Sequence, residues 1–367
     1  MDHATGDSKV DWREWGPEPF EYAAVADRPV LLSLSASWCS SCLEMDAETY
    51  GEPRIAARVG DSFVPIRVDV DRNPRVRDRY NMGGFPTTAF LSPDGTVLAA
   101  TGYLDADEMR TTLDRVEERW DEDGSSAGTV PRVLEDADPP SGEVTGEIEA
   151  FLAGRLSETF DREHGGWGEG AKFPAPRTVE FALKREREEA RRTLDAIGRN
   201  LQDDDGGFFR YAAEPDWSDP SREKLLDANA ALVRAFSNAY LSTGEAAYRR
   251  AVERGIEYLT TVLWTGEAFG GSEQIDGDGR TVDPTVFADR NGMAVDALLT
   301  YHAYTDDERT RRYARRTLDH LRSELLEDGV PVHYRDGTET GPRGLLADAA
   351  QVLAALTTAR EVLGVDT

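Results

Sequence analysis

Two cysteines three residues apart, in the segment Trp38-Cys39-Ser40-Ser41-Cys42, constrain this sequence more than any other feature. They are its only cysteines, and they follow an apolar run over residues 30–35 that predicts a buried strand. A helix is predicted from Ser41 to about Arg58. A pair this close in sequence cannot hold distant segments together. A reactive role is therefore favoured over a structural one.

The position of Cys39 at the predicted start of the helix indicates its reactivity. The first turn of a helix has unpaired amides and the positive end of the dipole, which favour a thiolate. We expect Cys39 to be the ionised, exposed sulfur and Cys42, one turn later, to attack a mixed disulfide formed on Cys39. The alternatives are a zinc half-site or two inert thiols. Zinc needs two further ligands, and the five histidines are scattered, so no metal and no dissociable cofactor is expected.

An α/β pattern continues to about residue 120. Strands are predicted over 63–70, 87–91 and 96–100, with helices over 74–80 and 105–120. The Pro-Asp-Gly at 93–95 predicts a hairpin turn. The X-Pro bond at Pro86 precedes a strand and can adopt the cis form found in tight turns.

The chain from about Trp12 to Trp120 resembles thioredoxin. The resemblance rests on the Trp-Cys-X-X-Cys segment, on Gly-Phe-Pro-Thr at 84–87 and on the hairpin turn. It implies that Pro86 is a cis proline beside the active disulfide and that the backbone around Phe85 pairs with a bound substrate strand. Trp38, Phe85 and Pro86 are accordingly the expected substrate-binding residues.

Two positions depart from the thioredoxin pattern. That family usually has Gly-Pro between the cysteines, where this chain has Ser40 and Ser41. It also has a buried Asp six residues before the first cysteine, where this chain has Ser33. Deprotonation of Cys42 is therefore expected to use water or another carboxylate, such as Glu44.

After residue 120 the composition changes. Residues 121–146 are rich in Asp, Glu, Gly, Ser and Pro and predict a linker, which separates a domain at 1–120 from one at 147–367. Apolar residues at three- and four-residue steps predict helices throughout the second domain. Double glycines at 165–166, 206–207 and 270–271 are expected to cap helices, with a following aromatic plugging the core. The charged stretch 184–192 either continues one helix or contains a break.

The second domain resembles the spermatogenesis-associated protein 20 type. The likeness rests on Gly165-Gly166-Trp167-Gly168, Gly206-Gly207-Phe208-Phe209 and the segment 221–229. It implies an α/α toroid similar to six-hairpin glycosidases, here shortened. The predicted fold class is thus an α/β thioredoxin-like domain followed by an all-α domain of helical hairpins.

The net charge of the chain makes some classes of binding partner unfavourable. Seventy acidic against 42 basic residues give a net charge of −28, which disfavours nucleic acid and anionic membranes. Only four of the basic residues are lysine, and this composition resembles that of proteins from salt-accumulating cells, where screening suppresses self-repulsion. No secretion signal precedes residue 8, so a cytoplasmic location is expected.

Three functions are compatible with these features. The leading one is a thiol–disulfide oxidoreductase with Cys39 as nucleophile, Cys42 as resolving thiol and the helical domain as a platform. Its expected partners are a protein or small-molecule disulfide and a thiol reductase that donates electrons. The second is a carbohydrate-binding or sugar-modifying toroid, with loop carboxylates as candidates: Glu169, Asp216, Glu223, Asp227, Glu273 and Asp283. The third is a redox-sensing scaffold.

Overall fold

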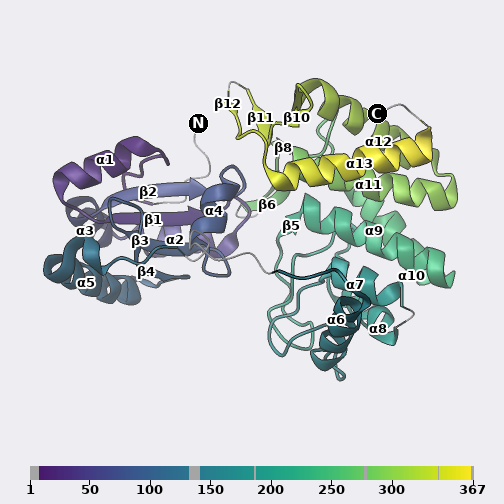
Figure 1. Cartoon of the computed structure of the whole chain (residues 1–367), viewed down its shortest axis with the longest axis horizontal. Helices are drawn as coiled ribbons and strands as arrows, with labels where there is room; N and C mark the ends of the chain where they lie inside the picture. The colour runs from purple at the N-terminus through teal and green to yellow at the C-terminus, as the bar shows by residue number, and fades with distance from the viewer. Residues whose placement is uncertain (1–7, 132–140, 186, 277–278, 338, 365–367) are drawn as a thin grey trace. The chain divides into compact units, whose positions relative to one another are not determined.

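The structure, a computed structural model, describes residues 8–131, 141–185, 187–276, 279–337 and 339–364. It divides into two compact units, Met1–Pro140 and Ser141–Thr367 (Figure 1). The amino-terminal segment and part of the predicted linker, residues 132–140, lie outside the described residues. None of the helices described is both long and apolar enough to cross a membrane.

A four-stranded sheet with the order β2-β1-β3-β4 forms the centre of the first unit. Strand β1 (Val30–Ser35) runs parallel to β2 (Val64–Asp69) and antiparallel to β3 (Thr87–Leu91), and β3 pairs with β4 (Val97–Thr101). The first five residues of β1 are all buried, as expected for a central strand covered on both faces. This arrangement confirms the predicted thioredoxin-like fold.

Within residues 8–131, the α-helices that accompany this sheet are α1 (Pro17–Ala26), α2 (Ser40–Glu48), α3 (Pro53–Ser62), α4 (Pro74–Tyr80) and α5 (Ala106–Asp123) (Figure 1). A 3₁₀ turn, η1 (Gly124–Ala127), follows α5. Helices α3 and α5 bury Ile55, Val59, Leu113 and Val116 against Phe90 of the sheet. The hydrophobic effect holds these helices on the sheet, because packing removes their apolar faces from water.

The single helix predicted from Ser41 to about Arg58 is wrong, because the chain forms two helices there. A Cβ atom on Gly51 would lie 2.1 Å from the carbonyl oxygen of Ala47, so the backbone folds tightly at this point. Pro53 then occupies the first turn of α3, where its missing N–H costs nothing. The break leaves α2 as a short helix that carries the cysteines.

The second unit consists of helical hairpins. Its helices are α6 (Gly146–Glu158), α7 (Pro176–Leu183), α8 (Glu188–Asn200), α9 (Leu226–Thr243), α10 (Ala246–Tyr258), α11 (Ala288–Thr305), α12 (Glu308–Glu324) and α13 (Leu346–Leu363), with a π-helical turn η3 (Leu259–Leu263) after α10. Helices α7, α9, α11 and α13 contact one another in succession, and α8, α10 and α12 pack outside them. This row of inner helices confirms the toroid-like fold. The stretch 184–192 contains a break, since α7 ends at Leu183.

Short strands in the connections were not predicted. Strands β5 (Lys224–Leu225), β6 (Ser272–Asp276) and β7 (Gly279–Asp283) form one small sheet, and β8 (Val286–Phe287), β11 (Tyr334–Asp336) and β12 (Glu339–Thr340) form another. Strands β9 (Leu326–Glu327) and β10 (Val330–Pro331) form a third. These strands lie in the connections that lead into the inner helices α9, α11 and α13, and β5 and β8 end directly before α9 and α11.

The double glycines lie in connecting loops and do not cap helices, so that prediction is wrong. They are needed because neighbouring groups approach closely. A Cβ on Gly206 would lie 2.2 Å from the carbonyl oxygen of Arg254, and one on Gly207 would lie 2.8 Å from the ring of Tyr258. The next residue, Phe208, is fully buried in the core, as the sequence predicted.

Two buried asparagines fasten these loops to the inner helices. The side chain of Asn229, in the first turn of α9, accepts from the amide of Phe208 at 2.7 Å and donates to its carbonyl at 3.1 Å. Asn291, in the first turn of α11, makes the same pair of bonds to Phe269, both at 2.9 Å. Each amide also donates to the carbonyl four residues earlier, so every polar atom of both side chains is satisfied.

Candidate active site

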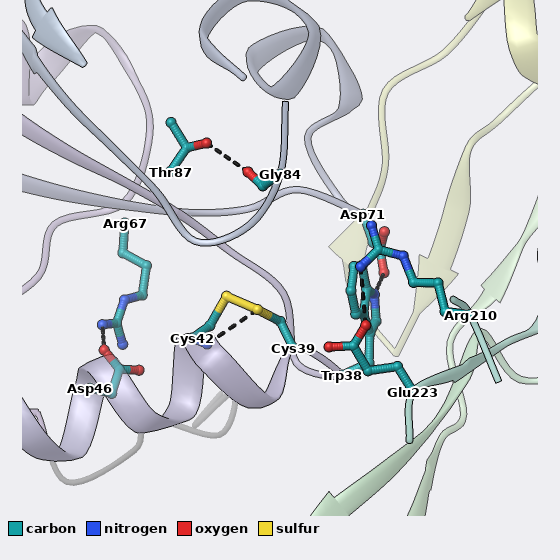
Figure 2. Close-up of a disulfide and its surroundings, with 10 residues drawn as sticks. All are labelled: Trp38, Cys39, Cys42, Asp46, Arg67, Asp71, Gly84, Thr87, Arg210 and Glu223. Carbon is teal, nitrogen blue, oxygen red and sulfur yellow. Dashed lines mark hydrogen bonds and ion pairs between the residues drawn. A yellow bond between two sulfur atoms is a disulfide. The ribbon is translucent and has the colours of Figure 1, made fainter. Parts of the chain in front are cut away.

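Cys39 and Cys42 form a disulfide at the start of α2, with their Cα atoms 5.2 Å apart (Figure 2). Cys39 is the N-cap residue of α2, and its sulfur accepts a hydrogen bond from the amide of Cys42 at 3.2 Å. In most helices an oxygen of Ser, Thr, Asp or Asn takes this place. A thiolate on Cys39 would therefore meet an aligned amide and the positive end of the helix dipole.

Cys39 is not exposed in this disulfide form, so the prediction of an exposed sulfur is wrong here. Its residue exposure is 2% and that of Cys42 is 3%. The sulfur of Cys39 is engaged by the bond to Cys42 and by the amide of Cys42.

The residues expected to bind substrate lie on two loops of the first unit. The Phe85–Pro86 peptide bond is cis, as the thioredoxin resemblance implies. The hydroxyl of Thr87 donates to the carbonyl of Gly84 at 2.7 Å and closes this loop (Figure 2). The ring of Trp38 meets that of Phe85 edge to face, with centroids 6.0 Å apart. Trp38 and Phe85 thus lie in contact, and their role in binding substrate stays a prediction.

Asp69 is the last residue of β2 and Asp71 lies two residues later, and Asp71 orients the Trp38 ring. The indole N–H of Trp38 donates to Asp71 at 2.6 Å. Asp69 accepts the backbone amides of Asp71 and Arg72, at 2.9 and 3.2 Å. Burial, together with the negative charge of Asp71, raises the pKa of Asp69 to about 6, although the two amide bonds oppose this shift.

An ion pair between a buried carboxylate of α2 and a half-buried arginine was missed from the sequence. Asp46 is four residues after Cys42, on the same face of α2, and it pairs with Arg67 of β2 (Figure 2). Burial raises the pKa of Asp46, and the charge of Arg67 and the hydrogen bond that it donates oppose that rise. Glu44, the carboxylate proposed from the sequence, is instead exposed.

The strand register places Arg67 beside a position that is acidic in the thioredoxin pattern. Ser33 of β1, which stands at that position, lies opposite Arg67 of β2. The buried carboxylate that pairs with Arg67 is Asp46 on α2 instead. The signal available in the sequence was the four-residue step from Cys42 to Asp46.

Five of the six loop carboxylates proposed from the sequence are engaged in local structure, and the sixth, Glu169, is exposed. Glu223 pairs with Arg210 at 3.0 Å, and Glu273 accepts from Tyr258 at 3.1 Å and from Arg280 at 3.2 Å. Three others accept backbone amides one or two residues ahead, namely Asp216, Asp227 and Asp283. These contacts stabilise turns and pairs of segments.

Among the lysines described, two are fully buried and act as centres of ion pairs. Lys172 pairs with Asp161 at 2.7 Å; burial opposes ionisation of Asp161, but the hydrogen bond from Lys172 and two backbone amides hold its pKa below the usual range. Lys224 pairs with Asp203 at 2.7 Å and Asp205 at 2.5 Å. Lys172 thus closes one loop onto a carboxylate 11 residues earlier, and Lys224 binds two carboxylates that lie 21 and 19 residues earlier.

Comparison with known proteins finds sequence relatives that extend over both units. Residues 2–133 match the family model Thioredox_DsbH, described as "Protein of unknown function, DUF255". Spermatogenesis-associated protein 20 of Homo sapiens is 27% identical over 294 residues, which cover 69% of this chain and 37% of the human protein. Thiol:disulfide interchange protein DsbD 1 of Pseudomonas aeruginosa is 34% identical over 104 residues, covering 26% of this chain and 17% of that protein.

Among solved structures, an unsaturated glucuronyl hydrolase specific for heparin aligns with a TM-score of 0.49 and 14% identity, over 81% of this chain and 96% of that one. The chain spans less than two fifths of the length of the curated relatives that match both of its units. The resemblance drawn from the sequence is confirmed: the chain carries a thioredoxin-like domain of the DsbH type and is homologous to spermatogenesis-associated protein 20.

Proposed function

We propose that this chain is a thiol–disulfide oxidoreductase whose reactive group is the Cys39–Cys42 dithiol. The observation that carries the proposal is the sulfur of Cys39 at the N-cap of α2, accepting the amide of Cys42. This geometry favours a thiolate on Cys39, and it leaves Cys42 within bonding distance for the second step.

The reaction transfers two electrons from the dithiol to a substrate disulfide. The thiolate of Cys39 attacks one substrate sulfur, forming a mixed disulfide and releasing the other substrate sulfur as a thiolate. Cys42, once deprotonated, attacks the sulfur of Cys39 and releases the second substrate thiolate. A thiol reductase or a small thiol then reduces the Cys39–Cys42 disulfide. Asp46 is the buried carboxylate nearest in sequence to Cys42 and is proposed to receive its proton.

The substrate would be a protein or small-molecule disulfide that lies along the loop of Phe85 and the cis Pro86. The helical unit would serve as a platform for a substrate or partner. We place the reaction in the cytoplasm, where thiols are kept reduced and a short-range pair is more often catalytic than structural. No dissociable cofactor is needed for these steps.

A mixed-disulfide trap tests the proposal. The Cys42→Ser variant should hold a disulfide substrate covalently on Cys39, and mass spectrometry should find the adduct there. The Cys39→Ser variant is the matched control and should trap nothing. In insulin reduction with dithiothreitol as donor, both variants should lose the catalysed rate. A Cys39→Ser protein that reduces insulin at the rate of the unaltered protein would refute the assignment.

The sugar-modifying alternative has a separate test. Calorimetry against oligosaccharides should show no binding that persists when both cysteines are replaced. Among the described candidates for sugar chemistry, Glu223 and Glu273 are held in ion pairs and Asp216, Asp227 and Asp283 in turns, which favours a structural role for these five carboxylates.

A further inference from the structure

Three potential metal ligands converge in the second unit, outside the dithiol site. Asp289, His333 and Asp348 each offer one ligand atom, and these atoms all lie within 4.8 Å of one another. Asp289 is in the first turn of α11, Asp348 is in the first turn of α13, and His333 lies between β10 and β11. Because 59 residues separate the first from the last, sequence spacing gives no sign of the group.

Backbone contacts hold the three segments together. The amide of Ala288 donates to the carbonyl of His333 at 2.8 Å, and the amide of His333 donates to that of Pro342 at 2.9 Å. Helices α11 and α13 cross closely at Gly292, where a Cβ would lie 2.8 Å from the carbonyl of Gln351. The imidazole of His333 lies beside the Phe287 ring, with centroids 5.3 Å apart. The ligand positions are therefore set by the fold.

The hydrogen-bonding capacity of Asp348 is only partly satisfied. It is fully buried, and one carboxylate oxygen lies 2.8 Å from Nδ1 of His333. The other oxygen is also buried and has no hydrogen-bond partner among the described residues. Buried carboxylate oxygens without partners are costly, and native proteins usually satisfy them with a hydrogen bond, water or an ion.

The two preceding inner helices give a reference for this position. Asn229 and Asn291 are the fully buried polar side chains in the first turns of α9 and α11, and the backbone satisfies all their atoms. In the first turn of α13 the fully buried polar side chain is Asp348, which faces a histidine and has an unpaired oxygen. The position in α13 therefore differs from those in α9 and α11, because its buried side chain keeps one polar atom without a partner. A bound ligand at this atom would account for the difference.

We propose that Asp289, His333 and Asp348 bind a divalent transition-metal ion. One imidazole nitrogen with two carboxylate oxygens is a donor set that suits Zn²⁺, and it suits Mn²⁺ through its oxygens. The ion would take the unpaired oxygen of Asp348, and its charge would offset the two buried or half-buried carboxylates. The proposal does not depend on the redox function, since it involves neither cysteine.

The test uses the full chain with Cys39→Ser and Cys42→Ser, because two thiolates would bind zinc themselves. The protein is stripped with a chelator and titrated with ZnCl₂, and separately with MnCl₂, by calorimetry, with elemental analysis for stoichiometry. We expect one equivalent of Zn²⁺ per chain and a higher melting temperature with the metal.

Variants assign the ligands. Asp289→Asn alters the least buried of the three and should lower the affinity for zinc at least about tenfold while the apoprotein keeps its melting temperature. Asp348→Asn should abolish binding. His320→Gln is the control, because His320 lies on α12 beside the exposed Glu267 and should not affect affinity. No binding of either metal, or binding that Asp289→Asn and Asp348→Asn leave unchanged, would overturn the proposal and leave a buried His–Asp pair only.

Discussion

The buried pair of Asp46 and Arg67 gives a prediction that can be worked through in energy. Replacing Arg67 with methionine leaves the carboxylate of Asp46 buried without its partner. Removing one member of a buried pair costs about 3–5 kcal/mol. The side chain of Arg67 is 17% exposed and that of Asp46 is 4% exposed. Solvent access to Arg67 favours the lower end of this range, about 3 kcal/mol.

The pH dependence of this penalty follows from the sign of the pKa shift. Burial already raises the pKa of Asp46, and Arg67 opposes the rise, so Arg67→Met should raise the pKa further. A carboxyl with a raised folded-state pKa contributes stability below its unfolded pKa and loses it as pH rises through the folded value. The penalty should therefore be small at about pH 3, below the usual Asp pKa of about 3.9, and larger at about pH 7.

Urea unfolding of the oxidised protein at both pH values measures the effect. The double variant Asp46→Leu with Arg67→Met removes both charges and should lie within about 1 kcal/mol of the unaltered protein. Arg67 also packs over the ring of Trp12, with its guanidinium carbon 4.5 Å from the ring centroid, and a methionine side chain would retain part of that contact. If Arg67→Met and the double variant lose the same stability at pH 7, removing the unpaired carboxylate recovers nothing and the reasoning fails.

Three further predictions concern the dithiol, the loops and the surface. Asp46→Asn should slow the decay of the mixed disulfide without slowing its formation; stopped-flow kinetics that find equal decay rates would contradict the proton-accepting role. Gly207→Ala should cost about 1–3 kcal/mol in thermal unfolding, because the new methyl meets the ring of Tyr258, whereas Gly154→Ala, with open space around it on α6, should stabilise by up to about 1 kcal/mol. Raising KCl from about 0.1 to 2 M should increase the melting temperature, since a net charge of −28 repels itself less; an unchanged melting temperature would remove the salt-adaptation interpretation.

The sequence predicted the elements that depend on local pattern. The buried strand, the cysteine at a helix start and the turn before Thr87 each follow from a run of neighbouring residues, and all are present. The helical hairpins likewise follow from apolar residues at helical spacing. The break at Gly51 was missed because it depends on a close approach to Ala47.

The features missed from the sequence are those made by contacts across the fold. Arg67 on β2 pairs with Asp46 on α2, 21 residues earlier, and the choice of Glu44 ignored which face of α2 is buried. The cluster around His333 unites three segments that no periodic pattern connects. Chemistry assembled in this way becomes visible only when the register and packing of the elements are known.

The asparagine fastenings have a consequence for a protein of such extreme charge. Asn229 and Asn291 are neutral amides in places closed to water, within a chain that has 70 acidic residues. Neither side chain gains or loses a proton, and neither interacts with dissolved ions. The alignment of one hairpin on the next should therefore persist through changes of acidity and salinity that greatly alter the field at the surface.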